Sequence, residues 1–137
     1  MSYLVDTNVV SELRKNRRCN PGVAAWFAGV SSEEIYLSVL TVGELRKGIE
    51  SIRRRDEAAA KALEAWLQEL VFAYSDRFLP VDQVIAEQWG RFSVPDPLPV
   101  FDALLAATAK VHGLTLVTRN LKHVERTGVD CMSPFST

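Results

Sequence analysis

The sequence predicts an α/β fold with three layers, in which helices cover both faces of a mainly parallel sheet of about four to five strands. Short apolar runs alternate along the chain with longer segments whose apolar residues recur every three or four positions. The first pattern is typical of buried strands and the second of amphipathic helices. Strands separated by helices need crossover connections, which favour parallel pairing. No linker divides the 137 residues, so we expect one domain over residues 1–137.

Five short segments are predicted to form the sheet. Most are rich in aliphatic, aromatic or β-branched residues, and polar or turn-forming residues follow them. The first predicted strand stops at Asp6 and the fourth stops at Thr118. The predicted strands, in chain order, are Tyr3-Leu4-Val5, Ile35-Tyr36-Leu37-Ser38, Phe78-Leu79-Pro80-Val81, Thr115-Leu116-Val117 and an edge strand at Asp130-Cys131-Met132.

Helices are predicted from capping residues and from apolar spacing. Asn8 is expected to cap the first helix, and Pro21 to begin the second, which Gly29 ends. Gly113 is expected to end the last long helix, after a break caused by three nearby prolines. The predicted apolar faces are, in chain order, Val9, Val10 and Leu13; Val23, Trp26 and Phe27; Val42, Leu45, Ile49 and Ile52; Leu63, Trp66, Leu67 and Leu70; Ile85, Trp89 and Phe92; and Phe101, Leu104, Leu105, Thr108 and His112.

The overall charge argues against a general polyanion binder. The chain has 16 Lys and Arg against 17 Asp and Glu, a formal net charge of −1, so any contact with nucleic acid must be local. The longest stretch without charge, residues 19–32, is too short to span a bilayer, and the N-terminus lacks the basic region of a signal peptide. Cys19 and Cys131 fit neither a disulfide framework nor a zinc site. These features predict a cytoplasmic protein that does not bind membranes.

Polar residues that follow strands are the first candidates for a functional site. In open parallel sheets, ligands bind beyond the C-terminal ends of the strands, among the loops that lead to helices. Asp6 follows the first predicted strand, Glu44 lies one turn past the second, and Thr118-Arg119-Asn120 follows the fourth. Asp102 begins the helix before the fourth strand, so the topology alone leaves its placement open. If that helix enters from the same pole, three carboxylates and an amide converge.

Such a convergence has a chemical consequence. Two carboxylates about 4 Å apart repel by roughly 4 kcal/mol at an effective dielectric constant near 20. A proton, a basic side chain or a hard cation must therefore compensate the charge. Ligation by oxygen alone, without thiol or imidazole, favours Mg²⁺ or Mn²⁺ over zinc. A divalent cation in such a cluster is suited to phosphodiester hydrolysis, because it activates water and neutralises phosphate charge.

Each of these residues also has an ordinary structural explanation. Asp6 is a natural helix cap, and Thr41-Val-Gly-Glu44 fits a capping box at a helix start. Asp102 can interact with a helix dipole alone, and Asn120 is a common turn residue. These explanations are strong for single residues and weaker for the set, because one pole of the fold can hold all four.

Two histidines and two basic runs have open roles. His112 lies near a helix end, where it can interact with the dipole, and His123 lies in a predicted loop near the site. Residues 14–18 and 53–55 are rich in arginine. Such runs are usually solvated surface, although either one can follow a phosphate backbone.

Four segments, taken in order, resemble a known family. They are YLVDTNVVSELRK, LSVLTVGELRKGI, VFDALLAATAKVHGLTLVTRN and GVDCMSPF. The sequence is similar to PIN-domain toxins of the VapC family, in particular the FitB-like branch. Because the resemblance runs from residue 3 to about residue 135, it implies a PIN-like α/β/α fold for a single PIN domain over residues 1–137.

The resemblance implies a Mg²⁺- or Mn²⁺-dependent endoribonuclease that hydrolyses RNA phosphodiester bonds. Asp6, Glu44 and Asp102 match the family's three acidic positions. Asp6 and Asp102 are expected to bind the metal directly, and Glu44 through water. Thr118 matches a residue that orients the acidic cluster. Asn120 occupies a fourth position, where many relatives carry Asp, and is expected to reach the metal through water.

The resemblance also implies partners. The toxin is held inactive by a cognate VapB-like antitoxin, forms a homodimer and a higher toxin–antitoxin assembly, and meets operator DNA only through the antitoxin. Arg119 is a candidate contact for RNA phosphate, and His123 stands where relatives often carry Asp or His.

Two other classes of function remain as alternatives. One is a non-catalytic or weakly active binding protein on a PIN scaffold. The other is a phosphoacceptor receiver module, which also gathers acids at the strand ends of a parallel sheet. A receiver needs an acidic pair after the first strand and a lysine after the last, whereas Asp6 stands alone and no such lysine is present.

Overall fold

A five-stranded parallel sheet forms the centre of the computed structural model, which describes residues 1–136. The strand order is β3-β2-β1-β4-β5, and each pair of neighbours is parallel. The prediction of a mainly parallel sheet is therefore confirmed, including the edge strand at Cys131, although the third strand is shorter than expected. The strands are β1 Tyr3–Val5, β2 Ile35–Ser38, β3 Phe78–Leu79, β4 Thr115–Val117 and β5 Cys131–Met132.

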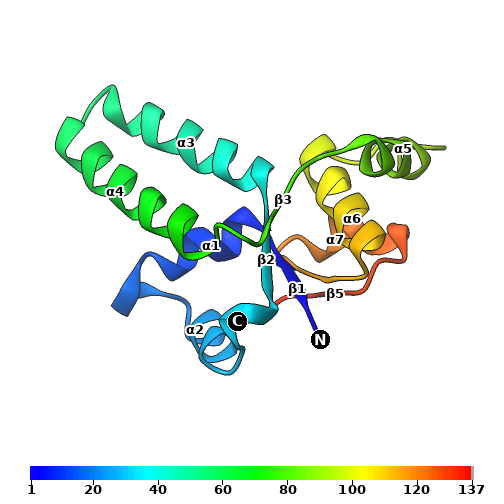
Figure 1. The fold of residues 1–137 in the computed structure, drawn as a ribbon, viewed down its shortest axis with the longest axis horizontal. Coiled ribbons are helices and arrows are strands. Elements are labelled where there is room, and N and C mark those ends of the chain that lie inside the picture. Colours follow the sequence, from blue (N-terminus) through cyan, green and yellow to red (C-terminus); the bar gives the residue numbers. More distant parts are fainter. Residues whose placement is uncertain (137) are drawn as a thin grey trace.

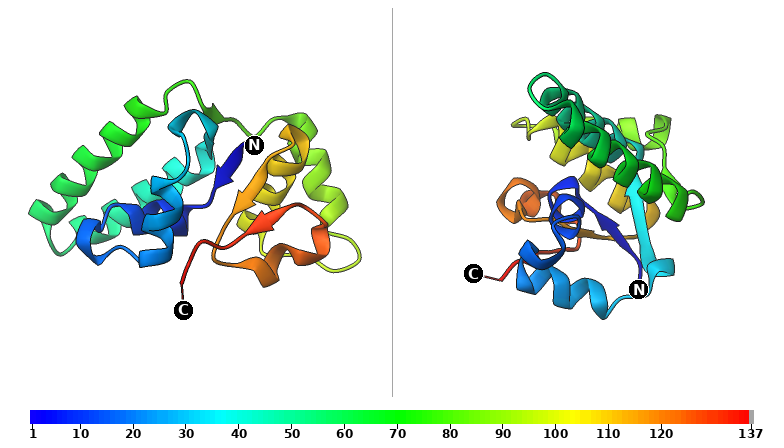
Figure 2. Two further views of the ribbon diagram at one scale, coloured as in Figure 1. Left: turned by 90° about the horizontal axis from the view of Figure 1, so that it is seen from below. Right: turned by 90° about the vertical axis from the view of Figure 1, so that its left-hand side faces the viewer.

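Helices lie on both sides of the sheet (Figure 1), as the crossover connections require. Two further views show the same arrangement, with the first four helices on one side of the strands and the last three on the other (Figure 2). The helices are α1 Thr7–Leu13, α2 Pro21–Ala28, α3 Val39–Arg53, α4 Glu57–Ala73, α5 Gln83–Phe92, α6 Val100–His112 and α7 Leu121–Val124. No helix within residues 1–136 combines the length and apolarity that crossing a membrane requires.

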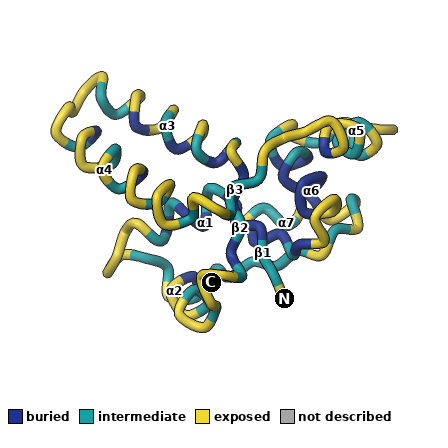
Figure 3. Tube along the Cα trace, in the orientation of Figure 1, coloured by how far each residue is buried: buried dark blue, intermediate teal, exposed yellow. Residues whose placement is uncertain are grey.

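The alternation of side chains along each strand divides the core in two. Val5 and Val117 pack with α1–α4, whereas their neighbours Leu4 and Leu116 pack with α6 and α7. Figure 3 shows that α6 is buried along most of its length, while α4 and α5 expose their outer faces. His112, which was expected on the apolar face of α6, is exposed at the end of that helix.

The helix caps expected at Asn8 and at Thr41 are wrong, whereas the cap at Asp6, which the sequence also allowed, is confirmed. Asp6, rather than Asn8, caps α1, because the chain enters the helix directly after β1 ends. Ser38, rather than Thr41, caps α3, so the helix begins at Val39 and the segment from Thr41 to Glu44 lies inside it. In both cases the cap is the first polar residue at the strand end.

Candidate active site

Asp6 is the most buried carboxylate at the C-terminal edge of the sheet, with 4% of its surface exposed. Its backbone N–H donates to Val117 O of β4, which extends the pairing of β1 past the strand end. Its Oδ1 accepts a hydrogen bond of 2.6 Å from the N–H of Thr7, the first residue of α1. The junction between strand and helix therefore holds the carboxylate in one orientation.

Thr118 fixes the second oxygen of this carboxylate. Its hydroxyl donates a buried hydrogen bond of 2.7 Å to Asp6 Oδ2 and accepts one of 3.0 Å from the backbone N–H of Asn120. Asn8 Nδ2 donates to the same Asp6 oxygen at 3.4 Å, and Asn8 Oδ1 accepts from the N–H of Arg119 at 3.3 Å. The loop after β4 and the first turn of α1 thus support Asp6 together.

Glu44 and Asp102 reach the same cleft from two other helices. Glu44 lies in the second turn of α3, the helix that leaves β2 at this edge. Asp102 lies in the first turn of α6 and is 9% exposed. Because α6 leads back into the parallel strand β4, its N-terminus lies at the C-terminal edge of the sheet. This resolves the placement of Asp102 that the sequence left open.

The cleft at this pole has a volume of about 470 Å³. Four of the predicted site residues line it, from four separate parts of the chain. The lining residues are Asp6, Thr7, Asn8, Glu44, Phe101, Asp102 and Asn120. The fold therefore brings the three acidic side chains and the amide to one surface, as the strand-end argument expected.

The cleft carries uncompensated negative charge. The pKa of Asp6 is raised to about 6, mainly by burial and also by the charges of Asp102 and Glu44, while the hydrogen bonds from Thr118 and Thr7 oppose the rise. Glu12 is a nearby contrast. Its pKa is lowered, because it accepts hydrogen bonds from Lys15 and from the Asn20 N–H. The surrounding donors thus favour the charged form of Glu12, whereas burial and neighbouring carboxylates disfavour the charged form of Asp6.

A hard divalent cation fits the chemistry of these donors. They are oxygen atoms of carboxylates and an amide, and no Lys or Arg is among the residues that line the cleft. Within residues 1–136, no three His, Cys, Asp or Glu side chains lie close enough to hold one metal ion as a group. Mg²⁺ commonly keeps several waters and takes one or two carboxylates, so this donor set suits Mg²⁺ or Mn²⁺ better than a fully protein-ligated ion.

His123 is a site neighbour whose contact the sequence did not define. It lies in α7 rather than in a loop, and its Nδ1 is 2.6 Å from Asp102 Oδ2. Asn8 and Thr7 were also missed as lining residues. The signal for them was their position directly after Asp6, in the first turn of a helix that starts at the site.

Arg119 points to another part of the molecule. Its guanidinium lies 4.6 Å from the ring centroid of Phe135, and its charge lowers the pKa of Glu12. It is not among the residues that line the cleft. The structure thus brings Asp6, Glu44, Asp102 and Asn120 to the cleft, with Thr118 behind Asp6, and leaves Arg119 beside the C-terminal segment.

Comparison with known proteins agrees with the fold. The sequence matches the PIN domain family over residues 3–128. It is 32% identical over 124 residues to the toxin FitB of Neisseria gonorrhoeae, covering 85% of this chain and 86% of that protein. It is 31% identical over 139 residues to the VapC ribonuclease Y4jK of Sinorhizobium fredii, covering 96% of each chain.

Solved structures give the same result. A structure of FitAB bound to a DNA fragment superposes with a TM-score of 0.87 at 27% identity, over 98% of this chain and 96% of that one. A toxin–antitoxin complex from Klebsiella pneumoniae superposes with a TM-score of 0.72 at 25% identity, over 99% of this chain and 100% of that one.

Proposed function

This chain belongs to the PIN domain family, and we propose that it is a divalent-metal-dependent endoribonuclease that acts as the toxin of a toxin–antitoxin pair. The observation that carries the proposal is the cleft where Asp6, Glu44, Asp102 and Asn120 meet. A buried carboxylate that other carboxylates surround is costly to the fold, so its presence calls for a function. The match to the PIN family removes the phosphoacceptor receiver as an alternative.

Each side chain of the cleft has its own role in the proposed reaction. Asp6 and Asp102 would hold Mg²⁺ or Mn²⁺, with Glu44 and Asn120 reaching the ion through water. The ion supplies a Lewis acid that lowers the pKa of water and neutralises phosphate charge. Thr118 keeps Asp6 in the orientation that binding needs, through its hydrogen bond of 2.7 Å. Glu44, which also lines the cleft, would help to orient the attacking water.

Substitution of Asp102 tests this function. Asp102→Asn removes one charge from the cleft with little change in shape, so we expect cleavage of total RNA with Mg²⁺ to fall at least about 100-fold. Asp96→Asn is the matched control, since Asp96 loses the same charge from an exposed position. EDTA should abolish cleavage by the wild type. A folded Asp102→Asn protein that cleaves at the wild-type rate would contradict the assignment.

The same experiment separates the nuclease from the remaining alternative. A non-catalytic or weakly active binding protein on the PIN scaffold would leave RNA intact with either metal, at any enzyme concentration that a toxin reaches in a cell. We place the action of the nuclease in the cytoplasm, and we assign the PIN domain to the whole of residues 1–137.

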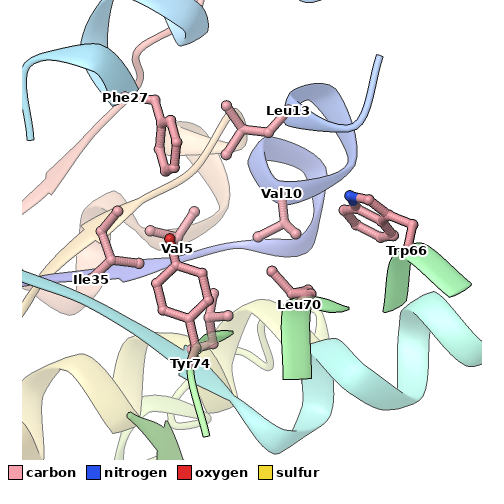
Figure 4. A pocket seen from close by; sticks show the side chains of 9 residues that line it. Val5, Val10, Leu13, Phe27, Ile35, Trp66, Leu70 and Tyr74 are labelled. Carbon is pink, nitrogen blue, oxygen red and sulfur yellow. The ribbon is translucent and has the colours of Figure 1, made fainter. Parts of the chain in front are cut away.

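An apolar hollow of about 210 Å³ offers a surface for the antitoxin. Figure 4 shows side chains from α1, α2 and α4 that converge on it, above the strands β1 and β2. Its lining residues are Val5, Val10, Leu13, Phe27, Ile35, Leu37, Trp66, Leu70 and Tyr74. We propose that an amphipathic antitoxin segment packs here, with part of the predicted 42–72 region as its wall. A basic side chain of the same antitoxin would enter the acidic cleft and replace the charge of the metal.

The end of α4 offers a surface for a second copy of the chain. Phe72 is 84% exposed and borders a shallow groove that Val42, Gly43, Leu67 and Val71 help to line. A two-fold axis at this patch would let each Phe72 enter the groove of the other copy. We propose that the homodimer forms here and that operator DNA contacts the higher assembly only through the antitoxin.

A further inference from the structure

A second, smaller hollow adjoins the acidic cleft between α1 and α3. Thr7 and Glu44 line both spaces, so the two meet at these residues. On the α1 side, the wall of the hollow continues from Thr7 through Ser11 to Arg14. These positions are four and three residues apart and therefore share one helix face. The hollow thus follows α1 away from the carboxylates for about 10 Å, the axial length of seven helical residues.

Arg14 is an exposed cation at the far end of this hollow. Within residues 1–136 it makes no ion pair and no side-chain hydrogen bond, in contrast to Lys15, Arg46 and Arg53, which pair with glutamates. A guanidinium whose five donors are free, at one end of a hollow whose other end meets the acidic cleft, is arranged for an external anion.

The opposite wall leaves room for a ligand. Gly48 of α3 lines the hollow, and a Cβ built at this position meets no atom within 4 Å. A larger side chain at this position would project into open space. Leu63 and Trp66 of α4 supply an apolar part of the lining, and the hydroxyls of Thr7 and Ser11 supply polar groups. The combination of a cation, hydroxyls and an aromatic surface is typical of binding to a single nucleic-acid strand.

We infer that this hollow carries the RNA strand on one side of the scissile bond, with Arg14 bound to a neighbouring backbone phosphate. The inference rests on the proposed nuclease function, because the strand is placed by the cleft that would cut it. RNA is favoured over an antitoxin segment by the charge of Arg14. An antitoxin that brings a basic residue towards the carboxylates would be repelled by this guanidinium, whereas a phosphate is attracted by it.

Binding and salt dependence test the inference. The probe is a fluorescein-labelled, randomised single-stranded RNA of twelve nucleotides, titrated with the full-length protein in EDTA so that it stays intact. Arg14→Gln should raise Kd by about tenfold, and the slope of log Kd against log salt should fall by about 0.7, the value for one lost phosphate contact with a single strand. Arg14→Lys should keep the slope and lose part of the affinity, since lysine retains charge without the fork of donors. Arg91→Gln, an equal loss of charge on α5, should leave both quantities near the wild-type values.

The outcomes distinguish this inference from the proposed function. Equal Kd values and salt slopes for Arg14→Gln and Arg91→Gln would overturn it. The inference would also be overturned by an Arg14→Gln protein that binds RNA normally but loses affinity for its cognate antitoxin. The hollow would then be a binding site for the antitoxin. If RNA binding depends on Arg14 but no variant, wild type included, cleaves RNA with Mg²⁺ or Mn²⁺, the nuclease assignment fails and the RNA contact stands.

Discussion

The two faces of the sheet are packed in different ways. On the face that α6 covers, Ala103, Ala106, Ala107 and Ala109 are completely buried, and small side chains let a helix lie close to its neighbours. On the face that α1–α4 cover, larger side chains such as Trp66 and Leu70 are only half-buried and surround a hollow. The first face is closely packed under α6 and has its hollow at the end of that helix, beside Leu79 and Leu114, whereas the second face has space at its centre.

This difference matches what each face contributes to the site. The α6 face holds Asp102, which we propose as a metal ligand, in the first turn of α6, where close packing restricts its motion. The α1–α4 face holds Glu44 and the two hollows that α1 lines, where a partner or a substrate strand can enter. Asp6 lies at the junction, at the end of the central strand β1. The proposed site therefore draws one carboxylate from a closely packed face and another from a face with free space.

Truncation of one leucine on each face gives the largest expected effect. Leu105 is completely buried on α6, so Leu105→Ala should lower the free energy of unfolding by about 3–5 kcal/mol. Leu70 is half-buried beside the hollow, and Leu70→Ala should cost about 1–2 kcal/mol, since its side chain has fewer contacts to lose. Urea denaturation of both variants measures the two costs. Equal costs would mean that the faces do not differ in packing.

Asp6, at the junction of the two faces, is expected to lower the free energy of unfolding of the metal-free protein. Because the folded-state pKa of Asp6 is about 6 rather than 3.8, the native state binds a proton more tightly than the unfolded chain does. Stability is thus unaffected below about pH 4, falls as the pH rises to about 6, and stays lower above it. Asp6→Asn should remove this penalty and stabilise the metal-free protein by on the order of 2 kcal/mol at pH 7.

Thermal unfolding in EDTA between pH 4 and pH 8 measures this effect. The gain from Asp6→Asn should become small near pH 4, close to the unfolded-state pKa of 3.8, because below this pKa the wild-type carboxyl is protonated in both states. Asp96→Asn, at an exposed position, should show no such pH dependence. With saturating Mg²⁺ the gain should shrink, because only the wild type is stabilised by the bound ion. A variant that is less stable than the wild type at every pH would show that Asp6 supports the fold through its hydrogen bonds alone.

The order of helices and strands could be predicted from the sequence, because apolar residues recur at different intervals in strands and in helices. The prediction failed at the caps, where several candidate residues stand together. Asp6, Thr7 and Asn8 can all cap a helix, and the choice depends on where pairing with β4 ends. The same holds at Ser38 and Thr41, because Ser38 is still the last residue of β2 when α3 begins.

The site was predictable as far as it follows from topology. Asp6 and Asn120 follow strands directly, so a parallel sheet alone brings them to one edge. The contact of His123 with Asp102 joins α7 to α6 across 21 residues and depends on how those helices pack. The direction of Arg119 depends on Phe135, which lies 16 residues later, near the C-terminus. Such contacts are set by packing, which no local pattern in the sequence records.

The smallest expected effect comes from adding carbon atoms rather than removing them. Val10 of α1 is buried, but its side chain borders the hollow, so Val10→Ile can extend into free space. The substitution keeps the branched Cβ, and one more buried methylene should stabilise the fold by up to about 0.8 kcal/mol. Ala106→Val places extra carbons against the closely packed α6 face and should instead destabilise it by about 1–3 kcal/mol. Opposite signs in urea denaturation would locate the free volume on one face of the sheet. If Val10→Ile were as costly as Ala106→Val, the hollow would be filled by the protein's own side chains in solution, and an antitoxin segment would have to displace them before it could bind.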